Sequence, residues 1–151
     1  MVTTQIPRDF IEFLKSCVAH DVKFLLIGGY ALGALGYVRN TVDIDVWIEA
    51  VPENRLRAVE AIRAFGFPRA EANLLDDPSV VVRMGVAPLR IEILQTISGV
   101  SFDECWPNRF YFAEGDLRVP VISLGDLRKN KRASGRPKDL ADLARLPKES
   151  T

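Results

Sequence analysis

Hydrophobic residues recur along the chain with two different periods, and these periods predict an alternation of helices and strands. Over residues 7–20 and 52–65, apolar side chains return every three to four positions, which is typical of amphipathic helices that bury one face. Short apolar runs at 23–28 and 42–49 predict two strands, with a short helix between them over residues 30–35.

The second half of the chain predicts further strands and two more helices, with a weaker pattern after residue 99. The strand segments are 79–84, 89–95, 110–112 and 117–122, a helical turn falls at 102–108, and the helices fall at 124–132 and 138–146. The whole pattern predicts one α/β (α+β) domain over residues 1–151, with a mixed β-sheet of about five strands flanked by helices. Its C-terminal segment, residues 123–147, is predicted to be helical and basic.

Two aspartates lie in the strand at 42–49, where apolar residues alternate with other types. Asp43, Asp45 and Trp47 fall on one face of this strand, and residues two apart lie roughly 6–7 Å from each other at Cα. Two carboxylates at that spacing can converge on a hard cation, which prefers oxygen ligands. The two aspartates also fit a solvated acidic edge of an amphipathic strand. Trp47 could stack on a base or cap the edge of the sheet.

A pair of glycines follows the first predicted strand. Gly28 and Gly29 fall at a strand-to-helix turn, where missing side chains allow a phosphate to approach backbone N–H groups. A tight turn alone also explains the pair. Glu92 lies between two isoleucines in a later strand, where a lone carboxylate is ordinarily a solvent-facing residue.

These motifs together resemble the nucleotidyltransferase superfamily, which includes DNA polymerase β and the aminoglycoside nucleotidyltransferases. The shared signature is Ile-Gly-Gly at 27–29, Val-Asp-Ile-Asp-Val at 42–46, and a third carboxylate between apolar residues at 91–93. The likeness is to small bacterial members related to abortive-infection toxins, which carry Arg-x-Thr before the aspartates and a basic segment with a Lys-Asp pair near the end. Gly29 departs from the serine that many members have at that position.

The resemblance implies a single minimal nucleotidyltransferase domain and a role for each motif. Asp43, Asp45 and Glu92 would be catalytic and would bind Mg²⁺, with Mn²⁺ as a substitute. The nucleotide-binding residues implied by the resemblance are Gly28, Gly29, Arg39, Thr41, Lys131 and Lys138.

The implied reaction moves a nucleoside monophosphate from an NTP to an acceptor hydroxyl and releases pyrophosphate, in a toxin–antitoxin or phage-defence system. The acceptor stays open between RNA such as tRNA, a partner protein and a small molecule. A homodimer or a cognate antitoxin is the expected partner. The alternative is a catalytically weak binding module of the same fold, which would act as an antitoxin or partner subunit.

Charge and composition narrow these expectations. Twenty basic and twenty acidic residues give a formal net charge of zero, which disfavours a general nucleic-acid binder. Residues 128–138 nevertheless carry six basic side chains and no acid, so they form either a solvated helix end or an arm over a triphosphate or an RNA backbone.

The remaining sequence features concern the compartment. Neither a membrane-spanning apolar run nor a secretory signal is visible. Cys17 and Cys105 match no metal-ligand spacing. We therefore expect a cytoplasmic protein with reduced, buried thiols.

Overall fold

The computed structural model describes residues 6–37, 43–85 and 89–147. In these ranges the predicted order of helices and strands is confirmed. The elements are α1 (Arg8–Ala19), β1 (Phe24–Ile27), α2 (Gly28–Ala34), β2 (Asp43–Ile48), α3 (Pro52–Phe65), β3 (Val82–Met84), β4 (Arg90–Leu94), α4 (Phe102–Cys105), the 3₁₀ turn η1 (Trp106–Asn108), β5 (Phe110–Glu114), β6 (Leu117–Val121), α5 (Leu124–Ser134) and α6 (Pro137–Arg145).

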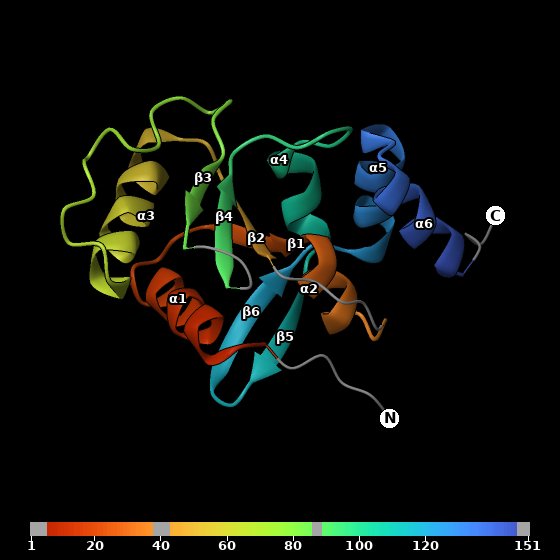
Figure 1. Ribbon diagram of the computed structural model, residues 1–151, viewed down its shortest axis with the longest axis horizontal. Helices are drawn as coiled ribbons and strands as arrows, with labels where there is room; N and C mark the ends of the chain where they lie inside the picture. The colour runs from red at the N-terminus through yellow and green to blue at the C-terminus, as the bar shows by residue number, and fades with distance from the viewer. Residues whose placement is uncertain (1–5, 38–42, 86–88, 148–151) are drawn as a thin grey trace.

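The strands form one mixed sheet in the order β3-β4-β2-β1-β6-β5 (Figure 1). Strands β2 and β4 are parallel neighbours, as are β1 and β6, and the other pairs are antiparallel. The sheet therefore has six strands among the described residues, where about five were expected. The β5–β6 hairpin, in the part of the chain with the weakest pattern, joins the sheet through the parallel pairing of β6 with β1.

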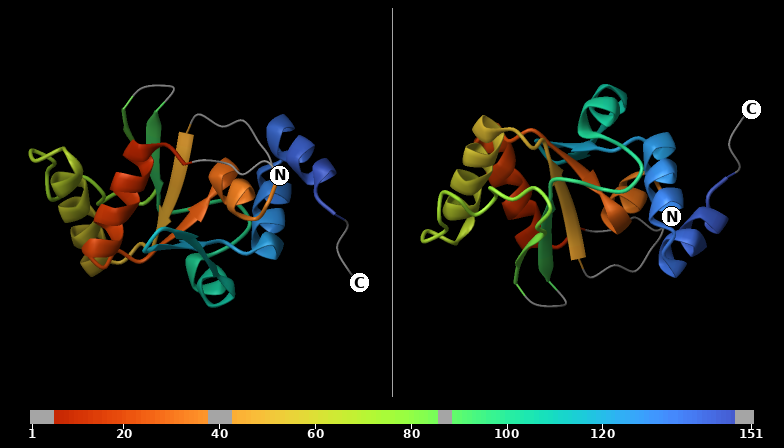
Figure 2. Two further views of the ribbon diagram at one scale, coloured as in Figure 1. Left: turned by 90° about the horizontal axis from the view of Figure 1, so that it is seen from below. Right: turned by 90° about the horizontal axis from the view of Figure 1, so that it is seen from above.

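Helices α1 and α3 cover one face of the sheet, and α4 lies on the other (Figure 2). The rings of Phe13 in α1 and Phe65 in α3 meet edge to face at 5.3 Å, and Ser16 donates a hydrogen bond to the Ala61 carbonyl at 2.7 Å. Helices α5 and α6 lie beyond α2, at one end of the sheet (Figure 1). The open part of the second face therefore lies between β2, β4 and the α5–α6 pair.

Trp47 belongs to the core. Its side chain is 1% exposed, its ring meets Phe102 of α4 edge to face at 5.2 Å, and its indole N–H donates to the Gln95 carbonyl at 3.2 Å. The expectation that Trp47 stacks on a base or caps the sheet edge is wrong, because α4 covers this end of the carboxylate-bearing face. The same packing leaves the other end of that face open at Asp43 and Asp45.

Local signals fix the ends of the helices beside this opening. The Ser123 hydroxyl accepts a hydrogen bond from the Asp126 amide and caps α5, as its sequence position predicts. Gly135 adopts the left-handed conformation, with φ 66°, and Pro137 begins α6 two residues later. The two helices are therefore joined by a tight turn that holds the basic segment against the open face.

Two further expectations concern the cysteines and membrane-spanning helices. Cys17 and Cys105 are both buried free thiols, as expected. Over the described ranges, no helix combines the length and the apolar character that crossing a bilayer would require.

Candidate active site

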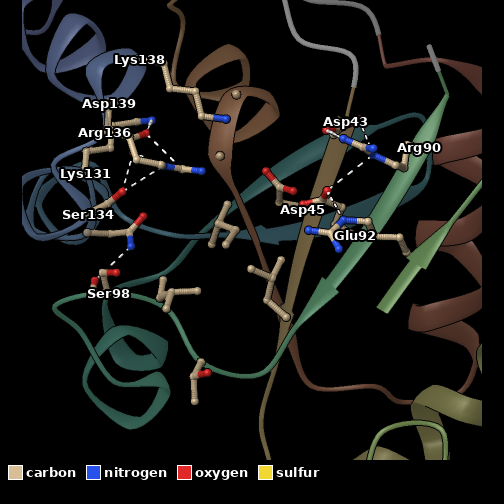
Figure 3. Close-up of a pocket in the computed structure, with 18 residues that line it drawn as sticks. Asp43, Asp45, Arg90, Glu92, Ser98, Lys131, Ser134, Arg136, Lys138 and Asp139 are labelled. Carbon is tan, nitrogen blue, oxygen red and sulfur yellow. Dashed lines mark hydrogen bonds and ion pairs between the residues drawn. The ribbon is translucent and has the colours of Figure 1, made fainter. Parts of the chain in front are cut away.

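Three carboxylates meet where two parallel strands lie side by side (Figure 3). In the register of β2 and β4, Asp43 pairs with Arg90 and Asp45 pairs with Glu92. Because paired residues on neighbouring strands project to the same face, both aspartates and Glu92 line the same cavity. We call Asp43, Asp45 and Glu92 the acidic wall. The strand of Glu92 therefore lies beside the strand of the aspartates, as the role implied for Glu92 requires.

The glycine turn comes directly against this wall. Gly28 has φ +71°, a conformation that residues with a side chain rarely adopt, and a Cβ at this position would lie only 2.3 Å from the Asp45 Oδ2 atom. Gly28 is therefore required both by its backbone conformation and by the closeness of the carboxylate. Gly28 and Gly29 begin α2 and line the same cavity as the acidic wall. The prediction that this pair lies where a strand passes into a helix is confirmed.

Asp45 is the carboxylate with the most perturbed proton affinity. Burial, then a hydrogen bond with Glu92 and the negative charges of Glu92 and Asp43, raise the pKa of Asp45 to about 7, while the positive charge of Lys138 lowers it. Asp45 therefore holds its proton up to near neutral pH, beside the carboxylate of Glu92. A cation placed between them would remove the repulsion that holds this proton in place.

Two arginines neutralise the rest of the acidic wall. Arg90 donates from Nε and Nη2 to the two oxygens of Asp43, at 3.1 and 2.8 Å, and its Nε lies 3.5 Å from Glu92 Oε1. Arg83 of β3 donates from Nε to the same Glu92 oxygen at 3.0 Å. Neither arginine was predicted from the sequence to belong to the site. The position of Arg90 could have indicated it, because Arg90 lies two residues before Glu92 and hence on the same face of the strand. Arg83 lies in β3, which pairs it with Glu92.

The donor types of the acidic wall suit Mg²⁺ or Mn²⁺, which prefer carboxylate oxygens. Among the described residues, however, no three Asp, Glu, His or Cys side chains are grouped so that they could hold a metal ion together. Both Asp43 oxygens point to the Arg90 guanidinium instead. The residues therefore fit a divalent cation in chemistry, and the orientation of Asp43 fits it only once Arg90 has moved.

A cavity of about 920 Å³ separates the acidic wall from α5 and α6. Arg136 and Lys138 line its far side, and Figure 3 shows both side chains pointing across it toward the carboxylates. We call these two residues the basic wall. Thr96, Ser98 and Asn130 line the cavity between the two walls. Pockets that enclose a small molecule commonly have volumes of about 300–1,000 Å³, so this cavity has room for a nucleotide.

Lys131 has a different environment from Lys138. It is 4% exposed, and its Nζ lies 2.9 Å from Asp142 Oδ2 and 3.4 Å from Asp139 Oδ1. Lys131, Asp139 and Asp142, which we call the buried cluster, thereby fasten α6 to α5. A role for Lys131 in nucleotide binding stays a prediction, and its two ion pairs favour a structural role. Arg39 and Thr41 lie outside the described residues.

Comparison with known proteins supports the fold. The chain matches no protein-family model, and no curated protein matches its sequence. Its structure is similar to a crystal structure from Thermotoga maritima named as that of a "putative nucleotidyltransferase", with a TM-score of 0.59 over 91% of this chain and 89% of that chain, at 13% sequence identity. The chain therefore has the nucleotidyltransferase fold, as the sequence motifs predict.

Proposed function

We propose that this protein is a Mg²⁺-dependent nucleotidyltransferase that moves a nucleoside monophosphate from an NTP to an acceptor hydroxyl and releases pyrophosphate. The observation that carries this proposal is the cavity itself. It places three carboxylates and a glycine turn opposite two basic side chains. Phosphoryl-transfer sites need this separation, because oxygen ligands hold the cation while basic groups neutralise the charge that develops on the phosphates.

Each residue has a distinct part in this reaction. Asp43 and Asp45 would hold the metal ion, and Glu92 would complete the set of oxygen ligands. When bound, the ion polarises the phosphoryl group and stabilises the attacking and leaving oxygens. Glu92, which lies beside Asp45 on the neighbouring strand, accepts the proton of the acceptor hydroxyl. The bond from the acceptor oxygen to the α-phosphorus forms as the bond from the α-phosphorus to the bridging oxygen breaks.

The triphosphate would bind between the glycine turn and the basic wall. Gly28 and Gly29 line the cavity at the start of α2, where phosphate oxygens would lie against them. Arg136 and Lys138 neutralise the negative charge on the departing pyrophosphate. Lys138 is placed for this role because its charge already acts on Asp45 across the cavity.

A binding module without turnover is the second candidate. It is favoured by one observation, the pairing of Asp43 with Arg90, which keeps the acidic wall neutralised without a metal ion. In that case the protein would serve as an antitoxin or as a partner subunit, and the cavity would bind a nucleotide without transferring it.

The two candidates differ in the transfer of label from nucleotide to acceptor. The protein is incubated with each of the four α-³²P-labelled NTPs and Mg²⁺, in the presence of total RNA, a protein extract or a small-molecule fraction. We expect label in one of these fractions, and its loss in the Glu92→Gln variant while binding of an NTP analogue is retained. Binding of the analogue with no transfer to any fraction would support the binding module instead.

A further inference from the structure

Arg90 holds the carboxylate that a metal ion needs. Its planar guanidinium makes a two-point contact with Asp43, and the same side chain reaches toward Glu92 at 3.5 Å. Such fork-to-carboxylate pairs are stronger than single hydrogen bonds and fix the orientation of the carboxylate. Asp43 is therefore held facing Arg90, across the strand pair, by both of its oxygens.

A metal ion and Arg90 compete for the same atoms. An ion bound by Asp43 needs at least one of the two oxygens that the guanidinium occupies, and it would bring a second positive charge beside the first. The Asp43 and Arg90 side chains are only 21% and 36% exposed, so the repulsion between ion and guanidinium is weakly screened. Contact of Asp43 with the metal therefore requires Arg90 to find another partner.

The nucleotide offers that partner. Two oxygens of a tetrahedral phosphate group can accept a pair of N–H bonds from a guanidinium, as the two oxygens of a carboxylate do. Arg90 lines the cavity that also contains the glycine turn and the basic wall. A triphosphate that enters this cavity therefore comes within reach of the guanidinium.

We propose that Arg90 is a latch that keeps the acidic wall closed to metal ions until a nucleotide arrives. Without nucleotide, the guanidinium takes the place of the cation at Asp43. When an NTP enters, Arg90 transfers to a phosphate oxygen and Asp43 turns to the metal ion. Metal and nucleotide are then bound cooperatively, and neither is held productively alone. This role rests on the proposed function, since it concerns the same metal site.

Arg83 is the natural control. It carries the same charge, lies on the neighbouring strand β3, lines the same cavity and contacts Glu92 at 3.0 Å. Its side chain is 56% exposed, and its contact leaves Asp43 with Arg90. Replacing Arg83 therefore changes the charge of the site in the same way as replacing Arg90, but leaves the two-point contact with Asp43 in place.

Mn²⁺ titration tests the latch without any measurement of turnover. Free Mn²⁺ is followed by electron paramagnetic resonance for the wild type and for Arg90→Gln, Arg90→Lys and Arg83→Gln. We expect Arg90→Gln to bind Mn²⁺ about tenfold more tightly than the wild type, because the guanidinium no longer competes with the ion for the two Asp43 oxygens. Arg83→Gln should change the affinity by less than about threefold, as exposed ion pairs contribute little. Arg90→Lys, which keeps the charge but loses the fork, should fall between them.

A second titration adds an α,β-methylene NTP analogue. Because the nucleotide releases the latch in the wild type, the analogue should increase the Mn²⁺ affinity more in the wild type than in Arg90→Gln. Circular dichroism checks that each variant is folded. If Arg90→Gln is unfolded, Arg90→Lys alone decides: tighter Mn²⁺ binding than in the wild type supports the latch, and unchanged binding overturns it.

The outcomes separate the latch from the function on which it rests. Mn²⁺ binding that is no tighter in Arg90→Gln than in Arg83→Gln would overturn the latch and leave the nucleotidyltransferase proposal intact. A lack of Mn²⁺ binding in every protein, with and without the analogue, would overturn both.

Discussion

Two clusters of charged side chains lie at the same cavity, and the pKa of a carboxyl group is shifted in opposite directions in them. In the acidic wall the pKa of Asp45 is raised to about 7, through burial and its carboxylate neighbours. In the buried cluster burial also acts to raise the pKa of Asp139, but hydrogen bonds from Arg136 and Ser134 and the charge of Lys131 bring it below its ordinary value. Burial is common to both, so the neighbouring charges decide the difference.

This contrast separates a stabilising site from a reactive one. The buried cluster is closed: Lys131 is 4% exposed and bridges two carboxylates from the next helix. The acidic wall is partly open, contains an aspartate with a raised pKa, and faces a cavity. Carboxylates that lie close together gain from a bound cation, because it removes the repulsion between them. We therefore expect changes in the acidic wall to affect turnover and changes in the buried cluster to affect stability.

The largest effect is expected when the acidic wall is changed. Asp45→Asn should lower turnover by at least about 10³-fold, some 4 kcal/mol in the activation barrier, because a proposed metal ligand is lost. The fold should persist, since the change removes a repulsive charge. Turnover is measured by transfer of α-labelled nucleotide, and folding by circular dichroism. Activity near that of the wild type would remove Asp45 from the reaction.

The buried cluster should respond in stability instead. Lys131→Met leaves Asp139 and Asp142 buried without their shared cation, which should lower the free energy of unfolding by about 3–4 kcal/mol. Urea denaturation followed by circular dichroism measures this change. The control is Lys129→Met on the same helix, where an exposed side chain is replaced and a change within about 0.5 kcal/mol is expected. Equal effects of the two substitutions on the free energy of unfolding would show that the buried ion pairs of Lys131 do not stabilise the fold.

The pH dependence of stability follows from the raised pKa of Asp45. Between its ordinary value of 3.8 and about 7, the folded protein holds a proton that the unfolded chain has lost, so stability falls as pH rises through this range. We expect Asp45→Asn to be more stable than the wild type at pH 8 by about 1–2 kcal/mol, and to show little gain at pH 4. Urea denaturation in EDTA at both pH values measures the difference. An equal gain in stability at pH 4 and pH 8 would contradict the raised pKa of Asp45.

The smallest effect is expected on nucleotide affinity, and it should distinguish Lys138 of α6 from Lys129 of α5. Lys138→Gln should weaken binding of an NTP analogue about tenfold, because it removes one charge that faces the phosphates. Lys129, whose side chain is exposed, serves as control, and Lys129→Gln should leave this affinity unchanged. Titration with tRNA at two salt concentrations runs in parallel. A loss of tRNA affinity with a flatter salt dependence, and no loss of NTP affinity, would instead make Lys138 an RNA contact.

Sequence patterns predicted much of this architecture because the signals are local. The helix predicted at 52–65 has those bounds in the structure, since it begins with Pro52 and is followed by Gly66. The alternation of β2 placed both aspartates on one face, and a similar pattern placed Glu92 there. The spacing of hydrophobic residues, with a proline at the start of the helix and a glycine after its end, was sufficient to predict these features.

The features that were predicted wrongly or overlooked depend on packing between elements that are far apart in the sequence. Alternation assigns Trp47 to a face of the strand but cannot tell that α4 covers it there. Charge counting likewise treats Lys131 and Lys138 alike, although one turns inward to α6 and the other faces the cavity. Arg90 was overlooked because its importance comes from the parallel register of β2 and β4, which join segments far apart in the chain.

That parallel register also sets an order of assembly. Asp43 and Arg90 are 47 residues apart in the chain, and parallel neighbours cannot be joined by a tight turn. Contacts between such distant segments form only after the intervening chain has been closed into a loop, which is slow and entropically unfavourable. A growing chain that ends before residue 89 therefore contains both aspartates and the glycine turn, but neither Glu92 nor the latch. Glu92 and Arg90 both enter the molecule on β4, so the three carboxylates are never together without the guanidinium that restrains Asp43.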